Sequence, residues 1–168
     1  MNLYPKAYFK KVTDITVEFL NENNIKGLML DIDNTLLDYD LNIIEGLEVW
    51  HKQMVDNGIK TIILSNSNKE KKAKLIAEKI DIDYILFAMK PLKRGFVKAK
   101  KKLELEEKNL AIVGDQIFTD VIGGNSLKIF SILVEPLDKK DLLITKIKRP
   151  IEDLVIKKYL KSKEKEVK

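Results

Sequence analysis

The sequence LMLDIDNTLL, residues 28–37, joins a short apolar run to two carboxylates and a hydroxyl. The run is too short for a helix and follows a glycine, so it predicts a buried β-strand. Asp31, Asp33 and Thr35 come directly after this strand. In open parallel α/β sheets, ligands bind just beyond the carboxyl ends of the strands. The stretch therefore predicts both a central strand and a functional site at its end.

The two carboxylates favour a bound cation. Successive residues of a strand alternate sides, so Asp31 and Asp33 would share a face if the strand continued through both. Two crowded carboxylates repel each other unless a cation or a shared proton relieves them, and Mg²⁺ suits an all-oxygen site. The alternative is a polar turn that caps a helix, since Asp, Asn and Thr are ordinary turn residues.

Short apolar runs alternate with helical patterns along the chain. The pattern predicts five strands, at residues 25–33, 59–64, 84–87, 109–113 and 129–134, with helices at 43–57, 69–80 and 92–103. Such alternation is typical of βαβ units, so we expect an α/β fold with a Rossmann-like, parallel, five-stranded sheet flanked by helices. Apolar residues at helical spacing predict one or two amphipathic helices over residues 3–22.

The length of 168 residues fits a single domain. We expect an amphipathic lead-in at residues 1–24, a catalytic core at 25–136 and a basic helical extension at 137–168. The chain has no cysteine, which excludes disulfides and thiolate chemistry. It shows no signal-peptide pattern and no apolar run long enough to span a membrane. We therefore expect a cytoplasmic protein, either free or peripheral on the inner face of the cell membrane.

Polar residues follow four of the five predicted strands and could serve one phosphate group. In order they are Asp31, Asp33 and Thr35, then Ser65 and Asn66, then Lys90, then Asp115 and Asp120. A carboxylate that attacks phosphorus needs the negative charges neutralised, which calls for a metal ion and a cationic side chain. Lys90 offers the charge and Ser65 a hydroxyl donor, while Asp33 could act as general acid and base.

This set resembles the four motifs of haloacid dehalogenase (HAD) superfamily phosphatases over residues 26 to about 135. The matching residues are Asp31-x-Asp33-x-Thr35, Ser65, Lys90-Pro91 and Gly114-Asp115 with Asp120. The resemblance implies that Asp31 is a nucleophile that forms an aspartyl-phosphate and that Asp33 is the acid and base. It assigns Ser65, Asn66 and Lys90 to phosphate binding and places Thr35 in the catalytic set. It also implies Mg²⁺ on Asp31, the backbone carbonyl of Asp33 and Asp115, with Asp120 helping to hold the site.

The gaps between motifs leave no room for a cap domain, which members of the superfamily insert at two places. Residues 36–64 and 66–89 are each used up by one predicted helix and one strand. The flanking residues Leu3-Tyr4-Pro5, Ile25-Lys26-Gly27 and Pro136-Leu137 resemble the YqeG family, a capless group of subclass IIIA. That family is related to phosphatidylglycerophosphate phosphatases, so the expected reaction is dephosphorylation of phosphatidylglycerophosphate to phosphatidylglycerol.

The positive charge lies at the C-terminal end. Residues 138–168 hold 11 Lys/Arg and 6 Asp/Glu, which accounts for the net charge of +5. Helices are predicted at 138–148 and 151–160, split by Pro150. The second places Ile151, Leu154, Val155 and Tyr159 on one face, with Lys157, Lys158 and Lys161 beside or opposite it. Such a helix can lie on an anionic membrane or pack on the sheet.

Other functions are compatible with the same residues. An open site would also accept a phosphoprotein or a nucleic-acid end, although few aromatic residues stand in basic surroundings, which argues against nucleic acid. A phospho-accepting module of response-regulator type would carry its aspartate after the third strand and lack an acid two residues later. A catalytically silent scaffold is disfavoured because no motif residue is missing. The substrate and the oligomeric state are left open.

Overall fold

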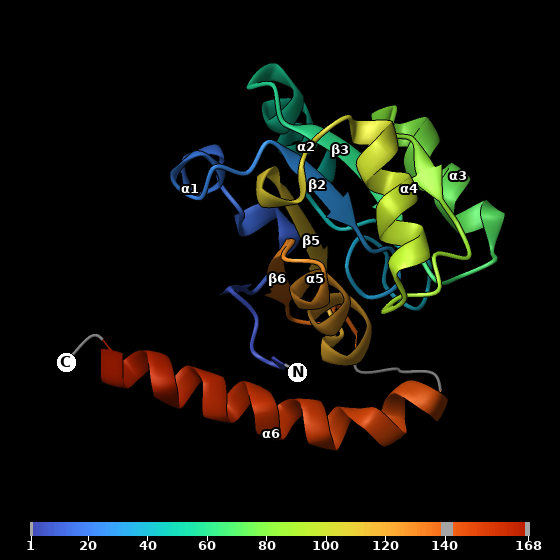
Figure 1. The fold of residues 1–168 in the computed structure, drawn as a ribbon. Helices are drawn as coiled ribbons and strands as arrows, with labels where there is room; N and C mark the ends of the chain where they lie inside the picture. Colours follow the sequence, from blue (N-terminus) through green and yellow to red (C-terminus); the bar gives the residue numbers. More distant parts are fainter. Residues whose placement is uncertain (1, 139–142, 167–168) are drawn as a thin grey trace.

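A six-stranded parallel sheet forms the middle layer of the molecule (Figure 1). The computed structural model describes residues 2–138 and 143–166, without the side chains of 143–149, 153 and 163–166. The strand order is β1-β6-β5-β2-β3-β4. The strands are β1 (Ala7–Phe9), β2 (Gly27–Leu30), β3 (Lys60–Leu64), β4 (Tyr84–Ile85), β5 (Leu110–Gly114) and β6 (Phe130–Val134). The predicted α/β class is confirmed, and the sheet has one strand more than the five predicted.

The central strand β2 is buried along its whole length. Leu28 pairs with Thr61 of β3 on one side and with Ala111 of β5 on the other, all in parallel register. An apolar run without alternation is what a parallel strand covered on both faces requires. Because the strands are parallel, their carboxyl ends meet at one edge, and the polar residues that follow β2, β3, β4 and β5 gather there.

Helices cover both faces of the sheet. Alternation along β2 sends Leu28 and Leu30 to one face and Met29 to the other. The first face packs against α1 (Val17–Glu22), α2 (Leu47–Asp56) and α3 (Glu70–Ile80), and the second against α4 (Lys93–Leu103), α5 (Ile122–Ser126) and α6 (Leu143–Glu166). The connection from β2 to β3 contains only α2, and that from β3 to β4 contains only α3, so neither carries a cap domain.

The N-terminal segment differs from its prediction. Residues 3–22 were expected to be helical, but they form β1, a 3₁₀ turn at Val12–Asp14 and the short helix α1. Ala7 pairs with Ile132 of β6, and the Lys6 amide donates to the Ser131 carbonyl at 2.9 Å. The extended conformation satisfies backbone groups on β6 that a helix at this position would leave unpaired.

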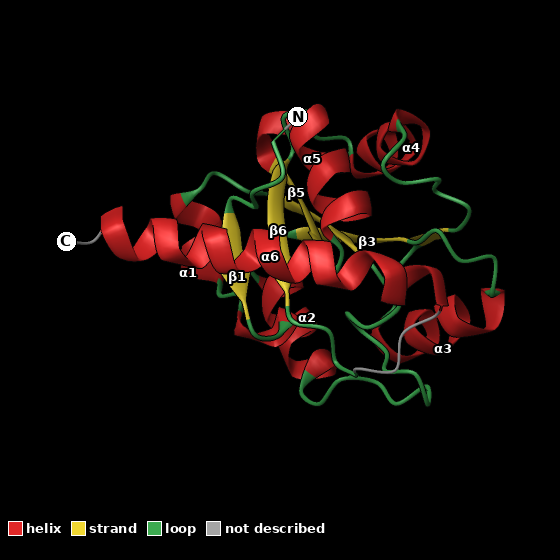
Figure 2. Cartoon of the chain, turned by 90° about the horizontal axis from the view of Figure 1, so that it is seen from below, coloured by secondary structure: helices red, strands yellow, loops and turns green. Residues whose placement is uncertain are grey.

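The C-terminal segment also differs, because Pro150 lies inside one continuous helix, α6. Residues 139–142 of the first predicted helix lie outside the described part of the chain. Glu152, Val155 and Tyr159 are buried, and Figure 2 shows α6 running across β6 and β1. This packing can offset the hydrogen bond that the proline removes. No helix within the described ranges is long and apolar enough to span a bilayer.

The face of α6 that packs against the rest of the protein contains fewer residues than predicted. Val155 and Tyr159 are buried, and the Tyr159 ring lies 5.9 Å from that of Tyr4. Ile151 and Leu154, which were assigned to the same face, are each more than half exposed. The helix therefore packs on the sheet while leaving apolar and basic side chains in solvent.

Replacing Trp50 with Phe should destabilise the fold. The Trp50 indole N–H donates to the Ile15 carbonyl at 2.7 Å, and both residues are buried. Phenylalanine keeps most of the apolar contact but leaves that carbonyl without its donor, at a cost of roughly 1–3 kcal/mol. Urea denaturation should show this loss for Trp50→Phe, whereas Val49→Ala, at an exposed position on the same helix, should change stability by less than about 0.5 kcal/mol. Equal stability of the two variants would contradict the assignment.

Candidate active site

A cleft of about 1020 Å³ opens at the carboxyl edge of the sheet. Its walls are the loops after β2, β3 and β4, the first turn of α3 and the start of the segment after β5. Asp31, Asp33, Ser65, Asn66 and Lys90 all line it. The structure thus brings together residues that lie up to 59 positions apart in the chain.

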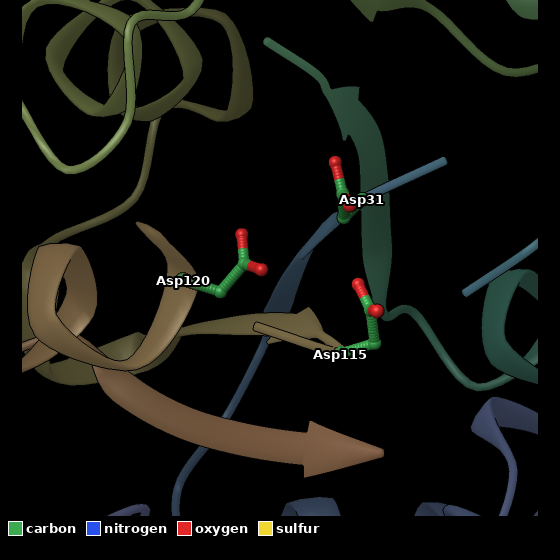
Figure 3. A group of neighbouring side chains, drawn as sticks. All are labelled: Asp31, Asp115 and Asp120. Carbon is green, nitrogen blue, oxygen red and sulfur yellow. The ribbon is translucent and has the colours of Figure 1, made fainter. Parts of the chain in front are cut away.

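Three buried carboxylates, one of them the cleft-lining Asp31, come close together at this edge of the sheet (Figure 3). Asp31 follows β2, Asp115 follows β5, and Asp120 stands on the single π-helical turn at Ile117–Val121. One oxygen of each lies within 4.8 Å of the others, and all three side chains are almost fully enclosed. Asp120, predicted to help hold the site, therefore belongs to the same cluster as Asp31 and Asp115.

Lys90 bridges two of these carboxylates. Its ammonium lies 2.7 Å from an oxygen of Asp31 and 2.6 Å from one of Asp120, with the lysine side chain itself 1% exposed. Burial acts to lower the pKa of Lys90, but the neighbouring carboxylates outweigh it and raise that pKa. Lys90 is therefore a permanent cation at the floor of the cleft.

Asn66 supports this lysine through its backbone, and Ser65 stands next to Asn66 in the chain. The Asn66 side chain accepts from the Lys90 backbone amide at 2.6 Å and donates to the Lys90 carbonyl at 2.9 Å. Ser65 is buried, and its hydroxyl accepts from the Ser67 amide at 3.1 Å. Asn66, predicted to bind substrate, thus holds the backbone of the loop that presents Lys90.

Asp33 does not share the environment of Asp31. The strand ends at Leu30, so the strict alternation expected through Asp33 is lost. The Asp33 carboxylate lies at the mouth of the cleft and forms an ion pair with Lys72 of α3. The mutual repulsion predicted for the two carboxylates is relieved in the structure by a separate lysine partner for each.

Thr35 lies away from the cleft surface. It is 1% exposed, does not line the cleft, and its hydroxyl makes no hydrogen bond within the described part of the chain. The loop that contains it turns sharply at Asn34, whose φ is 61°, and the Asn34 amide donates to the Leu37 carbonyl at 2.8 Å. The structure therefore buries the Thr35 side chain inside the same loop that carries Asp31 and Asp33.

The segment that presents Asp120 is fastened from two sides. One oxygen of Asp120 accepts from the Gln116 amide and from the Thr119 hydroxyl, at 3.3 Å and 3.2 Å. On the outer side, the buried carboxylate of Glu152 on α6 accepts from the Phe118 amide at 3.2 Å. The C-terminal helix thus reaches the loop next to the acidic cluster.

Comparison with known proteins adds an independent finding to this geometry. A family model described as mitochondrial PGP phosphatase matches residues 1–137 of the chain. The chain belongs to this phosphatase family. It is 38% identical over 153 residues to "Probable phosphatase YqeG" of Bacillus subtilis, with 90% of this chain and 88% of that one covered. Its resemblance to HAD superfamily phosphatases of the YqeG type is thereby confirmed.

Two further relatives are more distant. The chain is 27% identical over 167 residues to phosphatidylglycerophosphate phosphatase 1 of Arabidopsis thaliana, a match that covers 94% of this chain and 48% of that protein. A crystal structure of a HAD phosphatase from Thermococcus onnurineus aligns with a TM-score of 0.52 at 20% identity, over 77% of this chain and 56% of that one. The second comparison supports the HAD-like fold.

The acidic cluster of this phosphatase fits a divalent cation. Carboxylate oxygens are the ligands that Mg²⁺ prefers, and three of them lie within 4.8 Å of one another. Lys90 contacts two of the three carboxylates, those of Asp31 and Asp120. Asp31, Asp115 and Asp120 could together hold a divalent cation through one oxygen each.

The ionisation of Asp31 depends on its burial and on the charges around it. Burial raises the pKa of Asp31 from 3.8 to about 7; Lys90 opposes the rise and Asp120 adds to it. The folded protein therefore holds the proton more tightly than the unfolded chain does. Without a cation, the stability contributed by this proton is present at low pH and is lost as pH rises from about 4 through about 7.

Lys72 is a site residue that the sequence analysis missed. It stands among several lysines of α3, which in sequence look like one solvated face. A usable signal was its spacing, because Lys72, Ile76 and Ile80 follow each other at four-residue intervals and the two isoleucines are buried. Lys72 lies in the first turn of α3, on the same face as these two buried isoleucines. Its side chain is therefore expected to face the end of the sheet and not solvent.

Divalent-cation binding should appear as a pH-dependent gain in thermal stability. At pH 8, Mg²⁺ at a hundredfold excess over its Kd should stabilise the protein by roughly 2–3 kcal/mol. At pH 5 the gain should be smaller, because Asp31 then keeps its proton. Asp115→Asn should reduce the gain at pH 8, whereas Asp56→Asn, an exposed carboxylate on α2, should retain it. Differential scanning fluorimetry measures the gain for the wild type and for both variants. An equal gain in Asp115→Asn and Asp56→Asn would contradict cation binding at the acidic cluster.

Proposed function

We propose that the protein is a Mg²⁺-dependent phosphomonoesterase that works through an aspartyl-phosphate on Asp31. The observation that carries this proposal is the position of the Asp31 carboxylate, held at 2.7 Å by Lys90 on the floor of an open cleft. The cation bound at the acidic cluster would supply Lewis-acid stabilisation of the phosphate oxygens. The remaining chemistry is derived from side chains of this chain.

In the first half-reaction, an oxygen of Asp31 attacks the phosphorus of the substrate. The bond between phosphorus and the ester oxygen breaks, and the leaving alkoxide takes a proton from Asp33. Lys90 and the Ser65 hydroxyl stabilise the charge on the transferring phosphoryl group. Asp33 is suited to reach the leaving group because it stands at the mouth of the cleft, on the side where that group would lie.

In the second half-reaction, Asp33 takes a proton from a water molecule, whose oxygen attacks the phosphorus. The bond between phosphorus and Asp31 breaks, which releases inorganic phosphate and restores the carboxylate. Lys72 can pair with Asp33 between the two half-reactions, when Asp33 carries its negative charge, and it keeps the Asp33 side chain at the mouth. Lys90 remains charged throughout and holds Asp31 in position.

A membrane lipid is the substrate class that we favour, with phosphatidylglycerophosphate as the specific candidate. The family model and the Arabidopsis relative both carry that activity in their names. An uncapped cleft also suits a phosphate attached to a bulky group, since no inserted domain closes over it. Peripheral membrane contact is part of this proposal, and the exposed Lys157, Lys158 and Lys161 of helix α6 are one candidate surface for it.

Asp31→Asn should lower turnover by at least about a thousandfold, because the amide is nearly isosteric but cannot attack phosphorus. The assay measures phosphate release from phosphatidylglycerophosphate in mixed micelles, with Mg²⁺ and with chelator. An aryl phosphate runs in parallel as a generic ester. Asp56→Asn makes the same chemical change on the surface of α2 and should keep wild-type activity.

The outcomes separate mechanism from substrate. Mg²⁺-dependent release from the lipid, much faster than from the aryl ester and lost in Asp31→Asn, would support both. Release from the aryl ester alone would keep the phosphatase and direct the search to phosphoproteins and nucleic-acid ends. Wild-type turnover in Asp31→Asn would remove the nucleophile assignment.

A further inference from the structure

Exposed apolar side chains surround the mouth of the cleft. Tyr39 and Leu41 stand on the loop after β2, and Phe87 stands on the loop after β4; all three line the cleft. Met89 and Leu92 continue along the second loop. Phe87, Met89 and Leu92 are 65%, 51% and 57% exposed, and Tyr39 is 55% exposed. We call these five residues the mouth surface.

The backbone that aims Lys90 into the site turns its neighbours outward. Ala88 and Lys90 are buried, whereas Phe87 and Met89 face solvent. Phe87 and Met89 have φ values of 50° and 57°, a left-handed conformation that bulky residues rarely adopt. The Ala88 amide donates to the Ser65 carbonyl at 2.9 Å, which holds the loop against β3. The exposure of Phe87 and Met89 is therefore tied to the position of Lys90.

Basic residues flank the mouth surface. Lys69 and Lys71 line the cleft near the start of α3, and both are exposed. Lys93 and Arg94 are exposed in the first turn of α4, directly after Leu92. Helix α4 carries six basic and no acidic residues. Apolar side chains beside cations match the surface of an anionic bilayer, where apolar groups enter the head-group region and lysines are attracted to the lipid charge.

We propose that the mouth surface docks the protein on an anionic lipid bilayer, so that a lipid-borne phosphate enters the cleft above Asp31. The proposal deepens the proposed function and rests on it for the substrate. A head group can reach Asp31 only from the side on which the cleft opens, and Tyr39, Leu41 and Phe87 of the mouth surface line the cleft. Met89 and Leu92 are on the same loop and helix start as Phe87 and Lys90, whereas the exposed Ile151 and Leu154 belong to α6.

The test uses variants that remove apolar area while respecting the local backbone. Met89→Asn suits the left-handed conformation, and Leu92→Ser places a favoured residue at the N-cap of α4. Val49→Ser/Val55→Ser on α2 is the matched control, since both valines are exposed and lie outside the loops that carry the mouth surface. Ile151→Ser/Leu154→Ser examines α6 in the same way.

Flotation measures binding to phosphatidylcholine vesicles with and without phosphatidylglycerol, in the absence of substrate. Wild-type protein should bind the anionic vesicles, and Met89→Asn/Leu92→Ser should weaken the partition at least about tenfold. The α2 and α6 variants should bind like the wild type. Hydrolysis of a soluble aryl phosphate should be equal in all four proteins, whereas hydrolysis of vesicle-embedded phosphatidylglycerophosphate should fall with binding.

Two binding results would overturn the proposal: no binding of the wild type to anionic vesicles, or loss of binding in the α6 variant instead. A change of oligomeric state in Met89→Asn/Leu92→Ser, measured by light scattering, would also overturn it, because the mouth surface would then contact a second copy of the chain. Binding that depends on the mouth surface, without hydrolysis of the lipid, would retain the docking surface and reject the proposed substrate. The two proposals therefore fail in distinguishable ways.

Discussion

The ammonium of Lys90 lies between two buried carboxylates, and the arrangement of the surrounding loops depends on that bridge. Asp31 follows β2 and Asp120 lies in the turn after the neighbouring strand β5, and the two carboxylates would repel each other in a medium of low dielectric constant. Asn66 clamps the backbone on both sides of Lys90, and Glu152 fastens the loop beside Asp120. Removing the lysine would leave two enclosed charges without a counterion.

The site is organised as two charge pairs at different depths. Asp31 is enclosed with Lys90, where burial controls its ionisation, whereas Asp33 meets Lys72 at the mouth and remains in contact with solvent. In the proposed mechanism the enclosed carboxylate is the one that attacks and the solvent-exposed one exchanges protons with water, although only one residue separates them in the chain. The end of β2 at Leu30 produces this division, because the chain leaves the sheet before Asp33.

Sequence reasoning recovered the parts of the fold that are encoded locally. Each buried strand from β2 to β6 is an apolar run that ends in polar residues, so its existence and the gathering of Asp31, Ser65, Lys90 and Asp115 could be predicted. Strand β1 could not be predicted, because its three residues become a strand only by pairing with β6. Lys72 was hidden among similar lysines, and the continuity of α6 through Pro150 depends on packing against distant residues.

The pairing of β1 with β6 has a consequence for the order of assembly. Tyr8 lies beside Leu133, so the two strands that form this edge are separated in the chain by strands β2 to β5. During synthesis, β1 leaves the ribosome before β6 and has no strand to join until residue 134 has emerged. Non-local pairing of this kind is slow because loop closure must precede the contact. Until then, Tyr8 and Phe9 belong to an unpaired nascent segment that chaperones could recognise.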